Sequence, residues 1–200
     1  MRRTWLATLL LWAAPAALAV TPAKAPASPA APAVPQEAVV ETPQGRFVIR
    51  LMPELAPRHV AHFLKTARSG GYDGTTFHRL IAGGLIQGGD PLSKDPAKSA
   101  QYGTGGLGLL EAEFSQRPFA RGVVGAARRS APDSAGSQFF VVLREQPSLL
   151  GQYTIFGEVV EGLEVCDQIS ALPVAGDKAT QRVEMKVSLR DAAPPPAPAP

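Results

Sequence analysis

The sequence predicts a mainly β domain whose strands form a closed or nearly closed barrel, with two α-helices capping its ends. Short runs rich in β-branched and aromatic residues recur along the central part of the chain, bounded by Gly, Pro or Ser. Only two segments carry apolar residues at helical spacing, and no alternation of strands with helices indicates a parallel sheet. The length of about 150 residues between two Ala/Pro-rich segments is enough for one well-buried core.

The expected strands follow one another along this central region. The clearest is 46–51 (RFVIRL), in which apolar and polar residues alternate. A β-hairpin is expected within 75–91, where two alternating runs flank Ala82-Gly83-Gly84. The remaining expected strands are 122–127, 137–143, 153–160 and 182–190.

Two helices are expected beside these strands. The first begins near Pro57, a residue suited to a first helical turn, and Gly70-Gly71 ends it. Its apolar residues at helical spacing are Val60, Phe63 and Leu64. The second covers about 163–172, and its apolar stripe includes Cys166, which we expect to be a small buried residue.

The first nineteen residues are typical of a secretory signal peptide. A basic pair at Arg2-Arg3 precedes an apolar run, and Ala17-Leu18-Ala19 forms a small-x-small cleavage site. The apolar run is short for a transmembrane helix, which needs about 20 residues. We therefore expect an exported protein of the periplasm or cell envelope of a bacterium, without stable membrane insertion after cleavage. A retained N-terminal anchor is the alternative.

The rest of the chain divides by composition. Residues 20–36 are mostly Ala and Pro and are expected to form an extended linker, and 191–200 a disordered tail of the same kind. The folded domain is expected to span 37–190. Removal of residues 1–19 leaves 18 basic and 17 acidic residues, a net charge of +1 instead of +3, so nothing indicates a nucleic-acid partner. One cysteine excludes an intrachain disulfide and a multi-thiolate metal site.

The hairpin carries two polar side chains on an apolar face. If residues 82–84 form the loop, Ile81 lies opposite Leu85 and Arg79 lies opposite Gln87, and Phe77 shares their face. A guanidinium in such surroundings needs a partner, and the Gln87 amide can accept from it and fix its orientation. The alternative is an arginine that reaches solvent at a sheet edge.

Gln138 and Phe140 are expected to share one face of their strand, with Phe139 on the other. His78 is expected on the face opposite Arg79, as a structural residue. His59 and His62 lie one helical turn apart and are expected to be solvated surface residues, because no third metal ligand accompanies them.

Several motifs occur together in a specific order. These are YDGTTFHRLIAGGLIQGGD (72–90), GTGG (103–106), EF (113–114), GVVGAARRSAPDSAGSQFFVVL (122–143) and LLGQYTIFGEVVEG (149–162). In this combination the chain resembles the cyclophilin family of peptidyl-prolyl cis–trans isomerases, over essentially residues 39–190. The resemblance implies a closed eight-stranded antiparallel barrel capped by two helices, with a substrate groove on its outside.

The resemblance also implies a site. Arg79 matches the catalytic arginine of the family, and neither a metal nor a cofactor is expected. The positions that match its substrate groove are Leu85, Gln87, Ala127, Arg128, Gln138, Phe140, Leu149 and Tyr153. Leu85 replaces a methionine, Arg128 a common asparagine and Tyr153 a histidine. Gly84 stands where the family usually has a phenylalanine, which should leave the proline pocket wider or shallower.

The expected function is peptidyl-prolyl isomerisation of exported proteins as they fold. The expected partners are proline-containing unfolded or extended polypeptides, and the protein is expected to be a monomer. The alternative is a non-catalytic periplasmic chaperone or proline-peptide binding module that uses the same groove.

Overall fold

The computed structural model describes residues 36–191. The predicted signal peptide at 1–19, the predicted linker at 20–36 apart from residue 36, and the predicted tail at 191–200 apart from residue 191 lie outside the described residues. The first strand begins at Gln36 and the last ends at Asp191, where the two residues pair with each other. Regular structure thus extends one residue beyond each bound of the predicted 37–190 domain.

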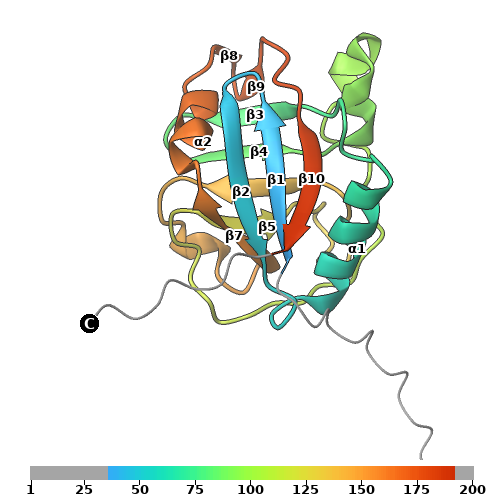
Figure 1. Cartoon of the computed structure of the whole chain (residues 1–200), viewed down its shortest axis with the longest axis vertical. Helices are drawn as coiled ribbons and strands as arrows, with labels where there is room; N and C mark the ends of the chain where they lie inside the picture. The colour runs from blue at the N-terminus through green and yellow to red at the C-terminus, as the bar shows by residue number, and fades with distance from the viewer. Residues whose placement is uncertain (1–35, 192–200) are drawn as a thin grey trace, which may run out of the picture.

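Ten strands form one antiparallel sheet that wraps around the core (Figure 1). Their order in the sheet is β10-β1-β2-β7-β5-β6-β4-β3-β9-β8. The strands are β1 (Gln36–Thr42), β2 (Gly45–Leu51), β3 (Phe77–Ile81), β4 (Leu85–Gly88), β5 (Val123–Ala126), β6 (Phe139–Val142), β7 (Ile155–Glu161), β8 (Val174–Ala175), β9 (Lys178–Ala179) and β10 (Lys186–Asp191). Three strands, β1, β8 and β9, are not among those that the sequence pattern predicts.

The predicted closed, eight-stranded barrel needs correction in two respects. Eight strands have four or more residues, but the two-residue strands β8 and β9 form a hairpin that pairs with β3 and brings the count to ten. Among the described residues no ladder joins the two ends of the sheet. The segments that precede β3 and β10 meet at an isolated bridge between Thr76 and Glu184, where the backbone of residues 74–77 exchanges hydrogen bonds with that of residues 183–185. Such short contacts have no alternating pattern that a sequence could reveal.

Both predicted helices are present. Helix α1 (Pro57–Arg68) begins at the predicted proline and packs against β10 and β7. Helix α2 (Leu163–Ser170) packs against β2, β3 and β4, and Figure 1 shows the two helices on opposite sides of the molecule. Cys166 is fully buried, as predicted. No helix within residues 36–191 is long and apolar enough to cross a membrane.

The buried apolar residues form two clusters. The larger cluster fills the interior and includes Phe139, together with the apolar faces of α1 and α2. The smaller one includes Phe140 and lies on the other face of β6. This division confirms the predicted alternation of β6 and places a second apolar layer on the outer face of the sheet. The members of the smaller cluster are Phe119, Val123, Ala127, Phe140, Val142 and Ile155.

Candidate active site

The β3–β4 hairpin has the predicted register at its tip. Arg79 pairs with Gln87, and Ile81 pairs with Leu85. A β-bulge between Phe77 and Arg79 inserts one extra residue into β3 and shifts the register. Because the extra residue reverses the alternation, Phe77 points into the interior core while Arg79 faces outward. The prediction that Phe77 shares the face of Arg79 is therefore wrong.

His78 is the extra residue of this bulge. It lines a cavity together with Arg79, so its predicted place on the opposite face is also wrong. The His78 side chain is nearly buried, at 7% exposure, and neither ring nitrogen has a hydrogen-bond partner among residues 36–191. Burial lowers the pKa of His78, which favours the neutral imidazole.

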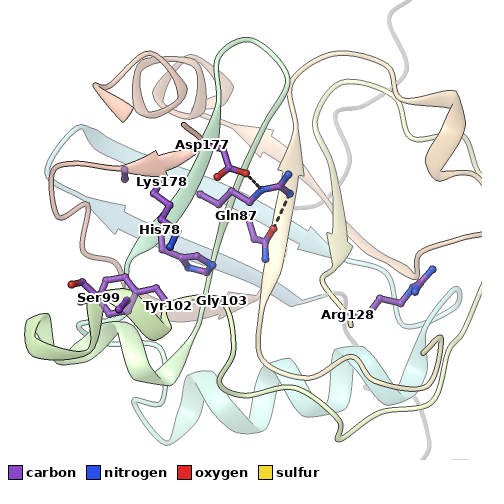
Figure 2. Close-up of a pocket in the computed structure, with 11 residues that line it drawn as sticks. His78, Gln87, Ser99, Tyr102, Gly103, Arg128, Asp177 and Lys178 are labelled. Atoms are coloured by element: carbon purple, nitrogen blue, oxygen red, sulfur yellow. Dashed lines mark hydrogen bonds and ion pairs between the residues drawn. The ribbon is translucent and has the colours of Figure 1, made fainter. Parts of the chain in front are cut away.

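Two side chains hold the Arg79 guanidinium (Figure 2). Its Nε donates to Asp177 Oδ2 at 2.7 Å, and its Nη1 donates to Gln87 Oε1 at 3.4 Å. The Gln87 contact was predicted from the hairpin register, whereas Asp177 was not singled out. Asp177 lies in the turn between β8 and β9, and its hydrogen bond with Arg79 lowers the pKa of its carboxyl. Nη2 makes no hydrogen bond to any described residue, so it remains available at the surface.

A chain of amides fixes Gln87 in turn. Its Nε2 donates to Gln138 Oε1 at 3.1 Å, and Gln138 Nε2 donates to the Gly105 carbonyl at 2.7 Å. Each amide therefore has its oxygen and nitrogen assigned by its neighbours. Gln138 is almost completely buried and does not line the groove. Gln138 was predicted to contact the substrate. In the structure it contacts Gln87 instead, and Gln87 lines the groove.

A small pocket of about 140 Å³ lies beside the guanidinium. It brings together eight of the nine residues that the resemblance assigned to the site. They are Arg79, Leu85, Gln87, Ala127, Arg128, Phe140, Leu149 and Tyr153. The Phe140 ring stacks on Phe119 at 5.9 Å between ring centres and meets the Tyr153 ring edge-on at 5.6 Å. An aromatic ring held on two sides in this way is a fixed apolar floor.

Arg128 stands at the rim of this pocket. Its guanidinium carbon lies 4.6 Å from the centre of the Tyr153 ring, and Arg128 Nε donates to the Gln152 carbonyl at 2.9 Å. Nη1 donates to the carbonyls of Arg129 and Ser130. The side chain is therefore a rigid part of the pocket wall and holds Tyr153 in place by a cation–π contact.

Gly84 does not line the pocket. Its N–H donates to the Ile81 carbonyl at 2.8 Å within the hairpin turn. A Cβ atom at this position would lie 2.8 Å from Ile81 Cγ2, so a side chain here would require Ile81 to move. The apolar surface of the pocket thus depends on Leu85, Phe140 and Leu149, without a ring at position 84.

The predicted exposure of His59 is wrong. His59 is 3% exposed, and its Nδ1 donates to Glu113 Oε2 at 2.6 Å. Glu113 lies 54 residues further along the chain. Burial lowers the pKa of His59, although the hydrogen bond with Glu113 acts in the opposite direction. Within residues 36–191, no group of three or more His, Cys, Asp or Glu side chains could hold a metal ion.

The family model of the cyclophilin-type peptidyl-prolyl cis–trans isomerases matches residues 38–189. The chain belongs to the cyclophilin family. This match spans all of the strands and both helices except the outermost residues of β1 and β10.

Curated relatives of this cyclophilin carry the same class of activity in their names. A probable peptidyl-prolyl cis–trans isomerase of Brucella suis is 44% identical over 136 residues, which are 66% of this chain and 69% of that protein. The peptidyl-prolyl cis–trans isomerase-like 3 protein of Gallus gallus is 36% identical over 154 residues, 76% of this chain and 91% of its own. This cyclophilin is accordingly an enzyme of the peptidyl-prolyl cis–trans isomerase class.

A solved structure supports the same relation. A Cryptosporidium parvum cyclophilin-type isomerase, whose crystal structure was determined in the presence of the dipeptide Ala-Pro, superimposes with a TM-score of 0.69 and 28% sequence identity. The match covers 79% of this chain and 99% of that one. The mainly β fold of this cyclophilin is thus the fold of its family.

Proposed function

We propose that this cyclophilin accelerates the isomerisation of X–Pro bonds in exported proteins as they fold, and that Arg79 is its catalytic residue. The substrates are unfolded or extended polypeptides that place a proline in the 140 Å³ pocket, and the protein acts as a monomer. Three findings support parts of this proposal: the signal-like residues 1–19, the bacterial relatives in Brucella, and the Ala-Pro dipeptide named for the Cryptosporidium structure. The proposed location is the periplasm or cell envelope, and N-terminal sequencing of the exported protein tests it.

The observation that carries the proposal is the position of Arg79. Its guanidinium lines an apolar pocket and is held by Asp177 and Gln87, while Nη2 has no partner among the described residues. A donor that is fixed before the substrate arrives needs no reorganisation during the reaction. This is the geometry of a group that stabilises one particular state of a bound peptide.

Rotation about an X–Pro bond breaks amide resonance, and the barrier is about 18–20 kcal/mol. At the twisted transition state the prolyl nitrogen regains its lone pair and accepts a hydrogen bond that the planar amide accepts poorly. An Arg79 N–H donates to this nitrogen, so the interaction is stronger in the transition state than in either ground state. The reaction forms no covalent intermediate and transfers no proton to the protein.

The other groove residues position the peptide. Phe140, Leu85 and Leu149 hold the proline ring in a site with little water, which strengthens the electrostatic effect of the nearby guanidinium. Tyr153 and Arg128 form the rim. Gln87 sets the direction of the guanidinium and offers no reactive group of its own.

Replacement of Arg79 by alanine tests the proposal. The Arg79→Ala variant is expected to lose about 10²–10³ of kcat/KM on a proline-containing test peptide, the range found when one transition-state donor is removed. Circular dichroism and the Tm should remain close to those of the wild type, because Arg79 is 42% exposed. Arg121→Ala is the matched control, since Arg121 is similarly exposed and also pairs with an aspartate, Asp167.

Unchanged turnover by Arg79→Ala would refute the assigned role. An NMR exchange experiment on the wild type separates the isomerase from the alternative binding module. Peptide binding without faster exchange between cis and trans would favour the non-catalytic module. The absence of an aromatic ring at position 84 is the sequence feature that favours this alternative.

A further inference from the structure

A second cavity of about 590 Å³ lies next to Arg79 (Figure 2). Its lining consists of His78, Arg79, Gln87, Ser99, Ala100, Tyr102, Gly103, Arg128, Asp177, Lys178 and Ala179. Three of these residues, Arg79, Gln87 and Arg128, also line the 140 Å³ pocket. The two cavities are therefore neighbours on either side of the guanidinium, and a peptide bound in the smaller one can continue into the larger.

The outer wall of this cavity comes from segments that the resemblance does not assign to the site. One wall is the 3₁₀ segment Pro96–Gln101 with Tyr102, and the other is the β8–β9 hairpin. The first wall is well anchored, because the buried Asp90 carboxylate accepts from the amides of Gly103 at 2.5 Å and Gly105 at 3.2 Å.

A second anchor fastens the same segment. Arg182 Nη1 donates to the Tyr102 hydroxyl at 2.9 Å and to the Ser93 carbonyl at 3.0 Å. The Tyr102 hydroxyl in turn donates to the Asp95 carbonyl at 3.0 Å. Tyr102 thus presents its ring to the cavity while its polar end is satisfied elsewhere, so the wall is preformed.

His78 is a nearly buried residue of this cavity's lining. Its ring meets the Tyr102 ring edge-on at 6.5 Å, and neither of its nitrogens has a partner among residues 36–191. Both nitrogens are buried, so His78 lines the cavity without offering it a hydrogen-bond donor.

The charges in the lining favour a negative ligand. Arg79, Arg128 and Lys178 are cations, and Asp177 is the one carboxylate in the lining. Asp177 is already paired with Arg79, and three carbonyls occupy Arg128. Lys178 forms no ion pair with any described residue, and in Figure 2 its side chain extends from β9 towards His78. Lys178 is therefore the unpaired charge of the cavity.

We propose that this cavity is a peptide subsite that selects an acidic side chain, Asp or Glu, on a substrate residue near the isomerised proline. The carboxylate accepts a hydrogen bond from the Lys178 ammonium, and its aliphatic part lies against Tyr102 and Ala179. A basic side chain would be repelled by the same three cations. The inference rests on the proposed function, because the ligand is the substrate peptide.

A matched peptide series tests the subsite. Each peptide contains one proline and carries Glu, Gln or Lys at a single position within three residues on either side of it. Affinity is measured by calorimetric titration, and isomerisation is measured by NMR exchange with the same peptides. At one position the Glu peptide is expected to bind about two- to fivefold more tightly than the Gln peptide, as an exposed ion pair allows, and the Lys peptide more weakly than both.

Variants of Lys178 identify the source of the preference. Lys178→Glu should reverse the order of the Glu and Lys peptides, and Lys178→Gln should reduce the preference for Glu. Lys186→Glu is the control, because it makes the same change of charge on β10, away from this cavity. The preference should also decrease at high salt, since the cavity mouth is open to solvent.

Equal affinity for the three peptides at every position, or an unchanged order in Lys178→Glu, would overturn the subsite. Binding with the expected preference but without faster exchange would support the subsite and contradict the proposed isomerisation. Faster exchange without any charge preference would support the proposed isomerisation and contradict the subsite.

Discussion

The Arg79 guanidinium has three nitrogens, and two of them are held before any substrate arrives. Asp177 takes Nε at 2.7 Å and Gln87 takes Nη1 at 3.4 Å, while Gln138 fixes the Gln87 amide from behind. A side chain with several rotatable bonds is thereby restricted to one direction. Arg79, Asp177, Gln87 and Gln138 thus act as one group. In the proposed reaction only Arg79 contacts the prolyl nitrogen.

Removal of the Asp177 charge tests this positioning role. Asp177→Asn is expected to lower kcat by about two- to tenfold and to change KM little, because a neutral acceptor holds Nε about 0.5–1.5 kcal/mol less strongly than a carboxylate does. Asp167→Asn is the matched control, since it weakens a similarly exposed pair with Arg121 far from the groove. Steady-state kinetics on one proline peptide measure both variants, and a normal kcat in Asp177→Asn would show that the negative charge at this position is not needed.

At the scale of elements, the pocket depends on how closely β5 approaches β6. Gly125 of β5 pairs with Phe140 of β6, and a Cβ atom on Gly125 would lie 2.4 Å from Phe140 Cζ and 3.0 Å from Phe119 Cε1. The absence of a side chain on one strand therefore makes room for the aromatic floor on the next. The bulge at His78 is a comparable local device, because it turns Arg79 outward while Phe77 stays in the core.

A methyl group at position 125 should displace the aromatic floor. Gly125→Ala is expected to lower the free energy of unfolding by about 1–3 kcal/mol through overpacking, and to weaken peptide binding. The double variant Gly125→Ala with Phe140→Leu should regain stability but not affinity, because the leucine makes room without restoring the ring. Urea unfolding and peptide titration measure the two effects, and a single variant with wild-type stability would show that β5 can shift outward.

For the whole molecule, the histidines couple stability to pH. Burial lowers the pKa of all three, His59, His62 and His78, below the value of an exposed histidine. Above about pH 6.5 the folded and unfolded chains both hold these rings neutral, so the shifts have no effect. Below that pH the unfolded chain takes up protons that the folded chain resists, so the free energy of unfolding falls.

We therefore expect the protein to be less stable at pH 5.5 than at pH 7.5. Urea unfolding at the two pH values, monitored by far-UV circular dichroism, measures the difference. His62→Gln should reduce the loss on acidification, since it removes one resisting group that is half-buried and lacks a partner for Nε2 among the described residues. A free energy of unfolding that stays constant between the two pH values would contradict the shared effect of burial.

The elements with strong local patterns could be predicted. The helices at 57–68 and 163–170 and the longer strands have apolar residues at the spacing of their structure, and the pairing of Arg79 with Gln87 follows from a three-residue loop. The resemblance to a known family then placed eight residues that do line one pocket. Sequence alone determined these features because each depends on residues that are close in the chain or on a specific set of motifs.

Only the tertiary structure decided which groups surround Arg79. Asp177 lies 98 residues further along the chain, and the second cavity is walled by segments near residues 96–102 and 174–179. The bulge that brings His78 to the same side has no signature in the alternation of β3. Contacts between distant segments and a one-residue shift in register depend on how the whole chain packs, so no local pattern of residues specifies them.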